Sequence, residues 1–186
     1  LMFGATSTNN QIYAKRGDED FVYAVKLDDT YQLTLPGDCF RTHNIWSFSE
    51  TNVAQVTVRQ NGKVRQLVRN GTNDWAIAAG SQGIITPMAV EETVHRLGDL
   101  NALFWVGRKF TDPDIGLTTN SLSLTVELKT GEKYSVDLGR QVPLASLRTQ
   151  SPLAAVTLDG ERWAFIFPPL LARLIDESLT IPADAP

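Results

Sequence analysis

The sequence alternates strictly between apolar and polar residues in Leu122-Ser123-Leu124-Thr125-Val126-Glu127-Leu128, and again through Tyr134, Val136 and Leu138. Successive side chains of a strand point to opposite faces of a sheet, so each half predicts a strand with one buried face. Thr130-Gly131 between the halves is typical of a turn. This stretch therefore predicts an antiparallel hairpin at the centre of the fold.

Further hairpins lie on both sides of this stretch. Upstream, the β-branched residues 53–58 lead to Asn61-Gly62, which is the strongest two-residue hairpin signal. Residues 63–69 and 75–78 complete a strand meander over residues 52–79. Downstream, residues 153–158 and 162–167 predict two more strands, so that strands occupy residues 121–167. Residues 11–16 and 20–27 predict another pair near the N-terminus.

Helical segments separate these strands. Thr86 is a good N-cap, Pro87 suits the first helical position, and apolar residues recur at helical spacing at Val90, Val94, Leu97, Leu100 and Phe104. They predict one main helix over residues 86–106, with a close packing contact at Gly98. Asp38 can cap a short helix over residues 39–48, and Pro168-Pro169 begins a terminal helix over residues 168–179. The sequence thus predicts an α+β fold of mostly antiparallel meanders and hairpins packed with one main helix and short helices.

The beginning of the chain is similar to its end. Residues 1–4 read like residues 136–139, and the acidic turn and aromatic strand of residues 18–25 read like residues 160–167. Such self-similarity is typical of tandem repeats. We therefore expect residues 1–48 to be the closing half of a preceding repeat unit, residues 49–182 to be one complete unit, and residues 183–186 to be a loose tail.

Composition excludes several function classes. Hydrophobic residues make up 42% and charged residues 20% of the 186 residues, as in ordinary globular proteins. The net charge is −4 without a cluster of Lys and Arg, which argues against nucleic acid as a partner. No apolar stretch approaches the ~20 residues that a transmembrane helix needs. The chain opens with Leu1, so we expect any signal peptide or membrane anchor to lie upstream.

The order of elements resembles the bacterial domain-of-unknown-function family 4340. The resemblance is carried by hydrophobic and turn residues, namely Phe48, Val53, Val56, Trp75, Ile77, Val90, Val94, Leu97, Leu100, Ala102, Gly116-Leu117, Val126 and Leu138-Gly139. In the first 48 residues it is carried by Gly4, Tyr13-Ala14 and residues 22–25. The resemblance implies a repeated unit in an accessory protein of ABC-type export or gliding-motility systems, tethered outside the cytoplasmic membrane. The single cysteine, Cys39, leaves a cytoplasmic location open as well.

The main helix offers one set of metal-binding candidates. Glu91, His95 and Asp99 follow one another at spacings of four residues, so they share one face of the expected helix. Imidazole and carboxylate groups are suitable ligands for a divalent metal. A solvated helix face stabilised by side-chain pairs is the alternative interpretation, and it needs no fourth ligand.

Signals for catalysis are weak. His43 follows Cys39 by four residues with Asp38 beside it, and such a group could activate a thiolate, although a buried structural cysteine explains it more simply. Asp112-Pro113-Asp114 with Gly116 resembles part of a calcium loop but lacks its closing Glu. The adjacent carboxylates Asp28-Asp29 and Glu91-Glu92 point apart in a regular element. We therefore expect no enzyme activity and no cofactor.

The aromatic residues are the remaining candidates for a binding surface. Four Trp (46, 75, 105 and 163) and four Tyr (13, 23, 31 and 134) could form a glycan-stacking or partner-binding surface, although core packing explains Trp75, Trp105 and Trp163 equally well. The leading hypothesis is a non-catalytic structural or protein-interaction module of an envelope assembly, with a protein partner. The alternative is a small-ligand or glycan-binding module.

Overall fold

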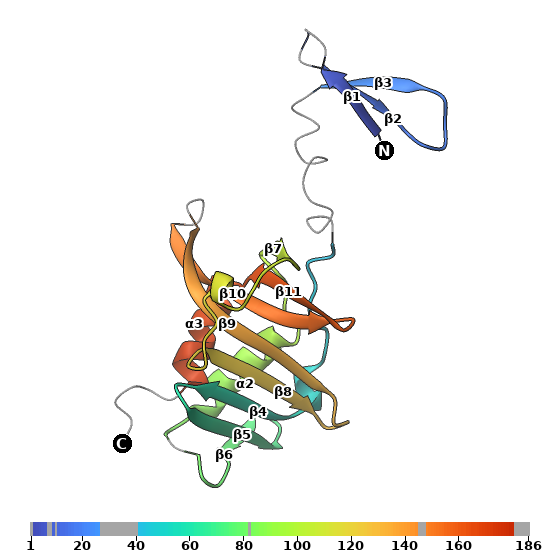
Figure 1. The fold of residues 1–186 in the computed structure, drawn as a ribbon. Helices are drawn as coiled ribbons and strands as arrows, with labels where there is room; N and C mark the ends of the chain where they lie inside the picture. Colours follow the sequence, from blue (N-terminus) through green and yellow to red (C-terminus); the bar gives the residue numbers. More distant parts are fainter. Residues whose placement is uncertain are drawn as a thin grey trace. The chain divides into compact units, whose positions relative to one another are not determined.

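A computed structural model describes residues 2–6, 9, 11–26, 41–81, 83–144 and 148–180. The chain divides into two compact units, residues 1–40 and residues 41–186. The first unit is a three-stranded antiparallel sheet in the order β1-β2-β3, drawn in blue in Figure 1. Its strands are β1 (Met2–Thr6), β2 (Gln11–Lys15) and β3 (Val22–Lys26). The two strands expected over residues 11–16 and 20–27 are confirmed.

The second unit is built on an eight-stranded antiparallel sheet in the order β6-β5-β4-β8-β9-β10-β11-β7. Its strands are β4 (Val53–Gln60), β5 (Lys63–Gly71), β6 (Asp74–Ile77), β7 (Phe104–Gly107), β8 (Leu122–Leu128), β9 (Lys133–Leu144), β10 (Thr149–Leu158) and β11 (Glu161–Ile166). Neighbouring strands in the sheet are consecutive in sequence except β4-β8 and β11-β7. The hairpin expected at Asn61-Gly62 joins β4 to β5, with positive φ angles at both residues.

The alternating stretch forms the centre of this sheet, as expected. β8 covers Leu122–Leu128, and every second residue from Leu122 is buried. It pairs with β9 on one side and with β4 on the other. The α+β fold of mostly antiparallel strands is therefore confirmed.

Two helices, α2 (Pro87–Leu97) and α3 (Pro169–Ser178), lie on one face of the sheet (Figure 1). They contact each other, and α3 contacts β10. Their apolar residues Val90, Val94, Leu97, Leu171 and Ile175 share one core cluster with the inward side chains of the sheet. The short 3₁₀ turns η2 (Glu50–Asn52) and η3 (Pro113–Ile115) complete the described elements. Across the described residues, neither α-helix is long and apolar enough to cross a bilayer.

The main helix is shorter than the 86–106 that its spacing predicts. It ends at Leu97, because the backbone carbonyls that follow accept hydrogen bonds from residues 45–48. Phe48 N–H donates to the Gly98 carbonyl at 2.9 Å, and Ile45 N–H donates to the Leu100 carbonyl at 2.8 Å. Phe104 belongs to β7, which pairs with β11.

Gly98 does mark a close contact, because a Cβ atom there would lie 2.4 Å from the carbonyl oxygen of Phe48.

The short helix expected over residues 39–48 is wrong for its described part. Residues 41–48 form an irregular segment with a single bridge from Asn44 to Asn101, because they bind the chain just after α2. These bonds hold residues 41–48 against the rest of the second unit.

A buried arginine joins three parts of the second unit. Arg65 in β5 is 2% exposed, and its guanidinium donates to the carbonyls of Ile84, Leu179 and Thr180, the first at 2.8 Å. Leu179 and Thr180 follow α3 directly, and Ile84 precedes α2. Burial lowers the pKa of Arg65. This one side chain thus anchors the ends of both helical segments to the sheet.

Candidate protein interface

The β1-β2-β3 sheet has two different faces. Phe3 pairs with Ala14, which pairs with Tyr23, and Ile12 pairs with Val25. Directly paired residues, and residues two apart in a strand, share a face. One face therefore consists of Phe3, Ile12, Ala14, Tyr23 and Val25, and we call it the apolar face. Lys15, Lys26, Tyr13, Val22 and Ala24 lie on the opposite face, by the same rule.

The first unit buries very little. Among its described side chains Ala14 alone is buried, at 5% exposure. Aromatic rings remain exposed, with Phe3 at 38%, Tyr13 and Tyr23 at 46% and Phe21 at 71%. A small sheet needs a second layer over an apolar face for independent stability. Exposed aromatic side chains are typical of protein interfaces.

Charged groups gather at the turn between β2 and β3. Arg16 donates to the carboxylate of Asp18 at 2.6 Å, and this bond lowers the pKa of Asp18. Lys15 pairs with Asp20 at 3.4 Å. Most charged side chains of the described first unit thus lie at this end of the sheet, Lys26 lies at the other end on the opposite face, and the apolar face itself carries no charge.

The three metal-binding candidates have separate partners. Glu91 accepts a hydrogen bond from Trp75 Nε1 at 2.6 Å and pairs with Arg69 at 2.8 Å. His95 Nδ1 lies 3.3 Å from Glu50 Oε2. The Glu50 pKa is lowered, first by a hydrogen bond from its own backbone and then by His95.

Asp99 lies beyond the end of α2, and its carboxylate accepts from Asn44 and Asn101. The shared helix face is therefore wrong for Asp99, because α2 ends two residues earlier. Across the described parts of the chain, no three His, Cys, Asp or Glu side chains form a group that could hold a metal ion.

The remaining candidate residues for catalysis or calcium binding also do not share one site in the described part of the chain. Cys39, Asp38, Asp28 and Asp29 lie outside the described residues, and His43 Nδ1 donates to the Ala102 carbonyl at 2.8 Å. After β7, the Asp114 carboxylate accepts hydrogen bonds from the hydroxyl of Thr111 and from its backbone N–H, and these lower the pKa of Asp114. Asp112 instead pairs with Arg162 at 3.0 Å. The two aspartates thus serve different partners.

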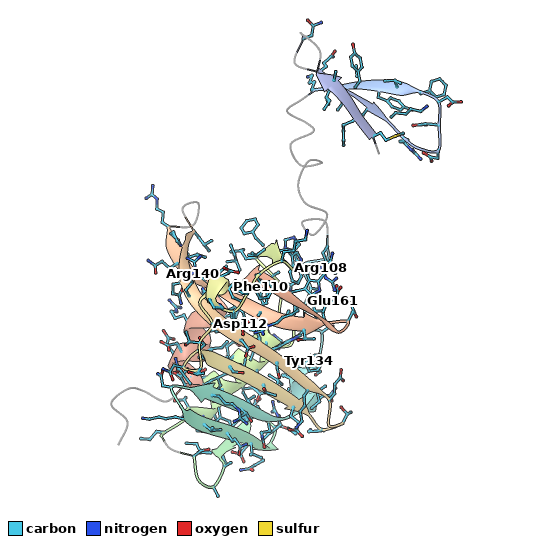
Figure 2. The ribbon with its side chains drawn as sticks, viewed as in Figure 1. Arg108, Phe110, Asp112, Tyr134, Arg140 and Glu161 are labelled. Atoms are coloured by element: carbon cyan, nitrogen blue, oxygen red, sulfur yellow. The ribbon has the colours of Figure 1, made fainter. Side chains whose placement is uncertain are left out.

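Arg108 and Glu161 join the ends of two neighbouring strands. Figure 2 shows both side chains beside the loop that carries Phe110 and Asp112, and an Arg108 nitrogen donates to Glu161 at 2.9 Å. The Arg41 and Arg108 guanidinium groups lie 4.4 Å and 5.0 Å from the ring centroid of Trp163. These contacts support the edge of the large sheet through cation–π packing.

All four tryptophans are buried in the second unit, so none of them offers an open stacking face. Most exposed aromatic side chains of the described residues lie instead on the first unit, and Phe104 of β7 is exposed at 55% on the second. Tyr13 and Tyr23 were among the sequence candidates, whereas Phe3 and Phe21 were missed. The similarity of residues 1–4 to residues 136–139 could have identified Phe3, because its counterpart Leu138 is a core residue.

A comparison with protein families finds one match. The model of a family described as Domain of unknown function (DUF4340) matches residues 1–120. The matched range includes β1 to β7 and α2, so Val126 and Leu138-Gly139 lie outside it. No curated protein and no solved structure matches the chain.

Proposed function

Because the chain belongs to the DUF4340 family, which has no assigned function, we propose that it is a non-catalytic module that binds another protein through its N-terminal sheet. The observation that carries this proposal is the apolar face of β1-β2-β3, on which Phe3 and Tyr23 are exposed. Complete burial of a large apolar side chain stabilises a complex by about 1.5–3 kcal/mol before the costs of association. Phe3 and Tyr23 are partly exposed, at 38% and 46%, so each could gain such burial against a partner.

The non-catalytic character is supported by the arrangement of the titratable groups. Glu91, His95 and Asp99 each bind a different neighbour, and so do Asp112 and Asp114. An acid–base or metal mechanism needs such groups to converge on one reacting atom. A binding module needs no such convergence.

We place the module in a bacterial envelope assembly, as an extracytoplasmic accessory of ABC-type export or gliding motility. This part of the proposal rests on what the resemblance to the family implies, and within the matched range the residues from Phe48 to Gly116-Leu117 carry that resemblance. Its partner is a protein component of that assembly. Fractionation of native cells followed by detection of the chain tests the location, and recovery in the cytoplasm alone would contradict it.

Photocrosslinking in native cells tests the interface. A benzophenone amino acid replaces Tyr23 on the apolar face, and a matched version replaces Lys63, which lies in an exposed hairpin of the second unit. We expect a discrete protein adduct from the position of Tyr23 and none from that of Lys63. Absence of an adduct from the positions of Phe3, Tyr23 and Val25 alike, in cells that accumulate the folded chain, would overturn the proposal.

A further inference from the structure

The face of the large sheet that points away from the helices is covered in part by the segment after β7. Ala155 of β10 and Ala164 of β11 lie on this face, and they form a second apolar cluster with Ile115 and Leu117 of that segment. The segment thus packs on the β10-β11 side of the sheet.

One row of directly paired residues runs across this face to the hairpin of β4 and β5. Directly paired residues of neighbouring strands share a face. From β11 to β5 the row consists of Ala164, Ala155, Asp137, Ser123, Arg59 and Val64. The row is therefore apolar beneath the covering segment and polar beyond it, where Asp137, Ser123 and Arg59 follow one another.

A pocket of about 600 Å³ lies at the polar part of this row. The hairpin of β4 and β5 lines it with Arg59, Lys63 and Val64, and the segment after β7 lines it with Pro113 and Leu117. Val64 is 40% exposed, so apolar surface is accessible beside the charged groups. A concave site that combines apolar walls with a few polar groups is typical of small-ligand binding.

The charged groups of this pocket are unequally paired. Arg162 binds both carboxylates that line the pocket, Asp112 at 3.0 Å and Asp137 at 3.1 Å. Arg59 and Lys63 line the same pocket, but neither forms an ion pair or a side-chain hydrogen bond within the described part of the chain. Two cations thus lack a counter-charge in a pocket whose own carboxylates are already bound.

We propose that this pocket binds a small organic monocarboxylate. Arg59 and Lys63 hold the carboxylate, the hydroxyl of Ser123 donates to it from the strand beside Arg59, and Val64 and Leu117 cover its apolar part. The planar guanidinium of an arginine can donate two parallel hydrogen bonds to a carboxylate. This inference goes beyond the proposed function, because it assigns a small ligand to the second unit.

The charges of the pocket favour a ligand with one negative charge. Arg162 and its two carboxylates together carry one net negative charge, and Asp137 lies only one strand beyond Ser123. A second negative charge on the ligand would therefore meet a charge of its own sign, and like charges repel. A monocarboxylate needs only the two unpaired cations.

NMR titration of the full chain with hexanoate and hexanamide tests this inference. The two probes have the same apolar chain and differ in the charge of the head group. We expect the methyl signals of Val64 and Leu117 to shift along a saturating curve with hexanoate, while that of Val22 in the first unit stays in place. Hexanamide should bind about tenfold more weakly or worse, because it lacks the charge. Sodium chloride at equal ionic strength is the blank.

Three glutamine variants provide a matched set. We expect Arg59→Gln and Lys63→Gln each to weaken hexanoate binding about tenfold, because each removes a charged donor. Lys129→Gln removes the same charge from an exposed position of the second unit that does not line this pocket, and it should leave binding within about twofold. Urea denaturation of each variant shows whether a loss of binding reflects unfolding.

Four results would overturn the inference. They are no saturable shift with hexanoate in the millimolar range, equal binding of hexanamide, equal losses in Lys129→Gln and Arg59→Gln, and tighter binding of inorganic phosphate than of hexanoate. The first two would reject the carboxylate site, the third would reduce it to general attraction between charges, and the fourth would reject a monoanion. None of them bears on the crosslink from the position of Tyr23, which tests the proposed function separately.

Discussion

At the scale of single residues, Arg65 has the most unusual environment in the second unit. It is buried, and in the described part of the chain its guanidinium donates to backbone carbonyls rather than to carboxylates. The carbonyls after α3 carry the negative end of the helix dipole, which suits a cation. Arg65 therefore stabilises the fold through its directional hydrogen bonds.

Replacing Arg65 tests this role. Arg65→Met retains much of the volume but leaves buried carbonyls without a donor, which should lower the free energy of unfolding by about 2 kcal/mol. Arg59→Met, at an exposed position of β4, should change it by no more than about 0.5 kcal/mol. Urea denaturation followed by tryptophan fluorescence measures both. Equal effects of the two variants would contradict the anchoring role.

Gly139 in β9 lies against the C-terminal end of η3. A Cβ atom there would lie 2.1 Å from the carbonyl oxygen of Ile115, and the backbone cannot yield as a flexible side chain does. We expect Gly139→Ala to destabilise the second unit by about 2–3 kcal/mol through overpacking. Gly71→Ala meets only ordinary contacts and should cost under about 1 kcal/mol. Thermal unfolding of both variants checks this difference, and an unaffected Gly139→Ala would contradict it.

Glu50 should give the second unit part of its acid sensitivity. Its pKa lies below the usual value of 4.5. The stabilisation is therefore complete above pH 4.5 and is lost as the pH falls through the lowered pKa. Glu50→Gln should flatten part of the decrease in Tm below pH 4.5, with Glu92→Gln as the control. Parallel Tm curves for Glu50→Gln and the unsubstituted chain would contradict the assignment.

At the scale of elements, α2 is attached to the sheet by one polar cluster. Glu91 binds both Trp75 of β6 and Arg69 of β5, and Arg69 also stacks on Trp75 at 4.5 Å from the ring centroid. Arg69 is only 5% exposed in this pair. Loss of Glu91 would therefore leave a buried guanidinium without its counter-charge.

The neighbouring residues Glu91 and Glu92 offer a direct comparison. Glu91→Ala should lower the free energy of unfolding by about 3 kcal/mol, because breaking a buried pair leaves an uncompensated charge. Glu92 forms an exposed pair with Arg96 at 2.7 Å, so Glu92→Ala should cost no more than about 0.5 kcal/mol. Chemical denaturation measures both values. Similar values for the two variants would show that the cluster does not hold α2.

Local patterns predicted most strands but not the end of the main helix. The alternation from Leu122 to Leu128 and the turn at Asn61-Gly62 depend on near neighbours, and both predictions are confirmed. Leu100 is buried and continues the helical spacing, yet it lies in a loop whose carbonyl is bound by Ile45 and Trp46. These partners are about 55 residues away along the chain, so periodicity alone could not reveal them.

The candidate interface could be predicted only in part. Tyr13 and Tyr23 were identifiable as candidate aromatic contacts, but Ile12, Ala14 and Val25 lie among apolar residues of both faces. Alternation therefore did not indicate which face is apolar and uncharged. The pairing of Phe3 with Ala14 and of Ala14 with Tyr23 resolves the two faces.

At the scale of the whole molecule, the two units should differ in stability. Among the described side chains of the first unit only Ala14 is buried, whereas β8 has a buried residue at every second position. Backbone hydrogen bonds that lack a packed layer open easily. Amide hydrogens of β2 should therefore exchange much faster than those of β8 in hydrogen-exchange mass spectrometry. Equal protection of the two strands would contradict this difference.

The place of β7 in the large sheet affects how the chain folds during synthesis. β7 pairs with β11, although the ribosome makes β8, β9 and β10 in between. At about 5–20 residues per second, the strand waits several seconds for its partner. Trp105 stays without the ring of Trp163, its neighbour in the finished fold, during that interval. The nascent chain therefore carries an unpaired, aromatic-bearing strand until its last sheet strand emerges, and this is the period in which a chaperone has the most to bind.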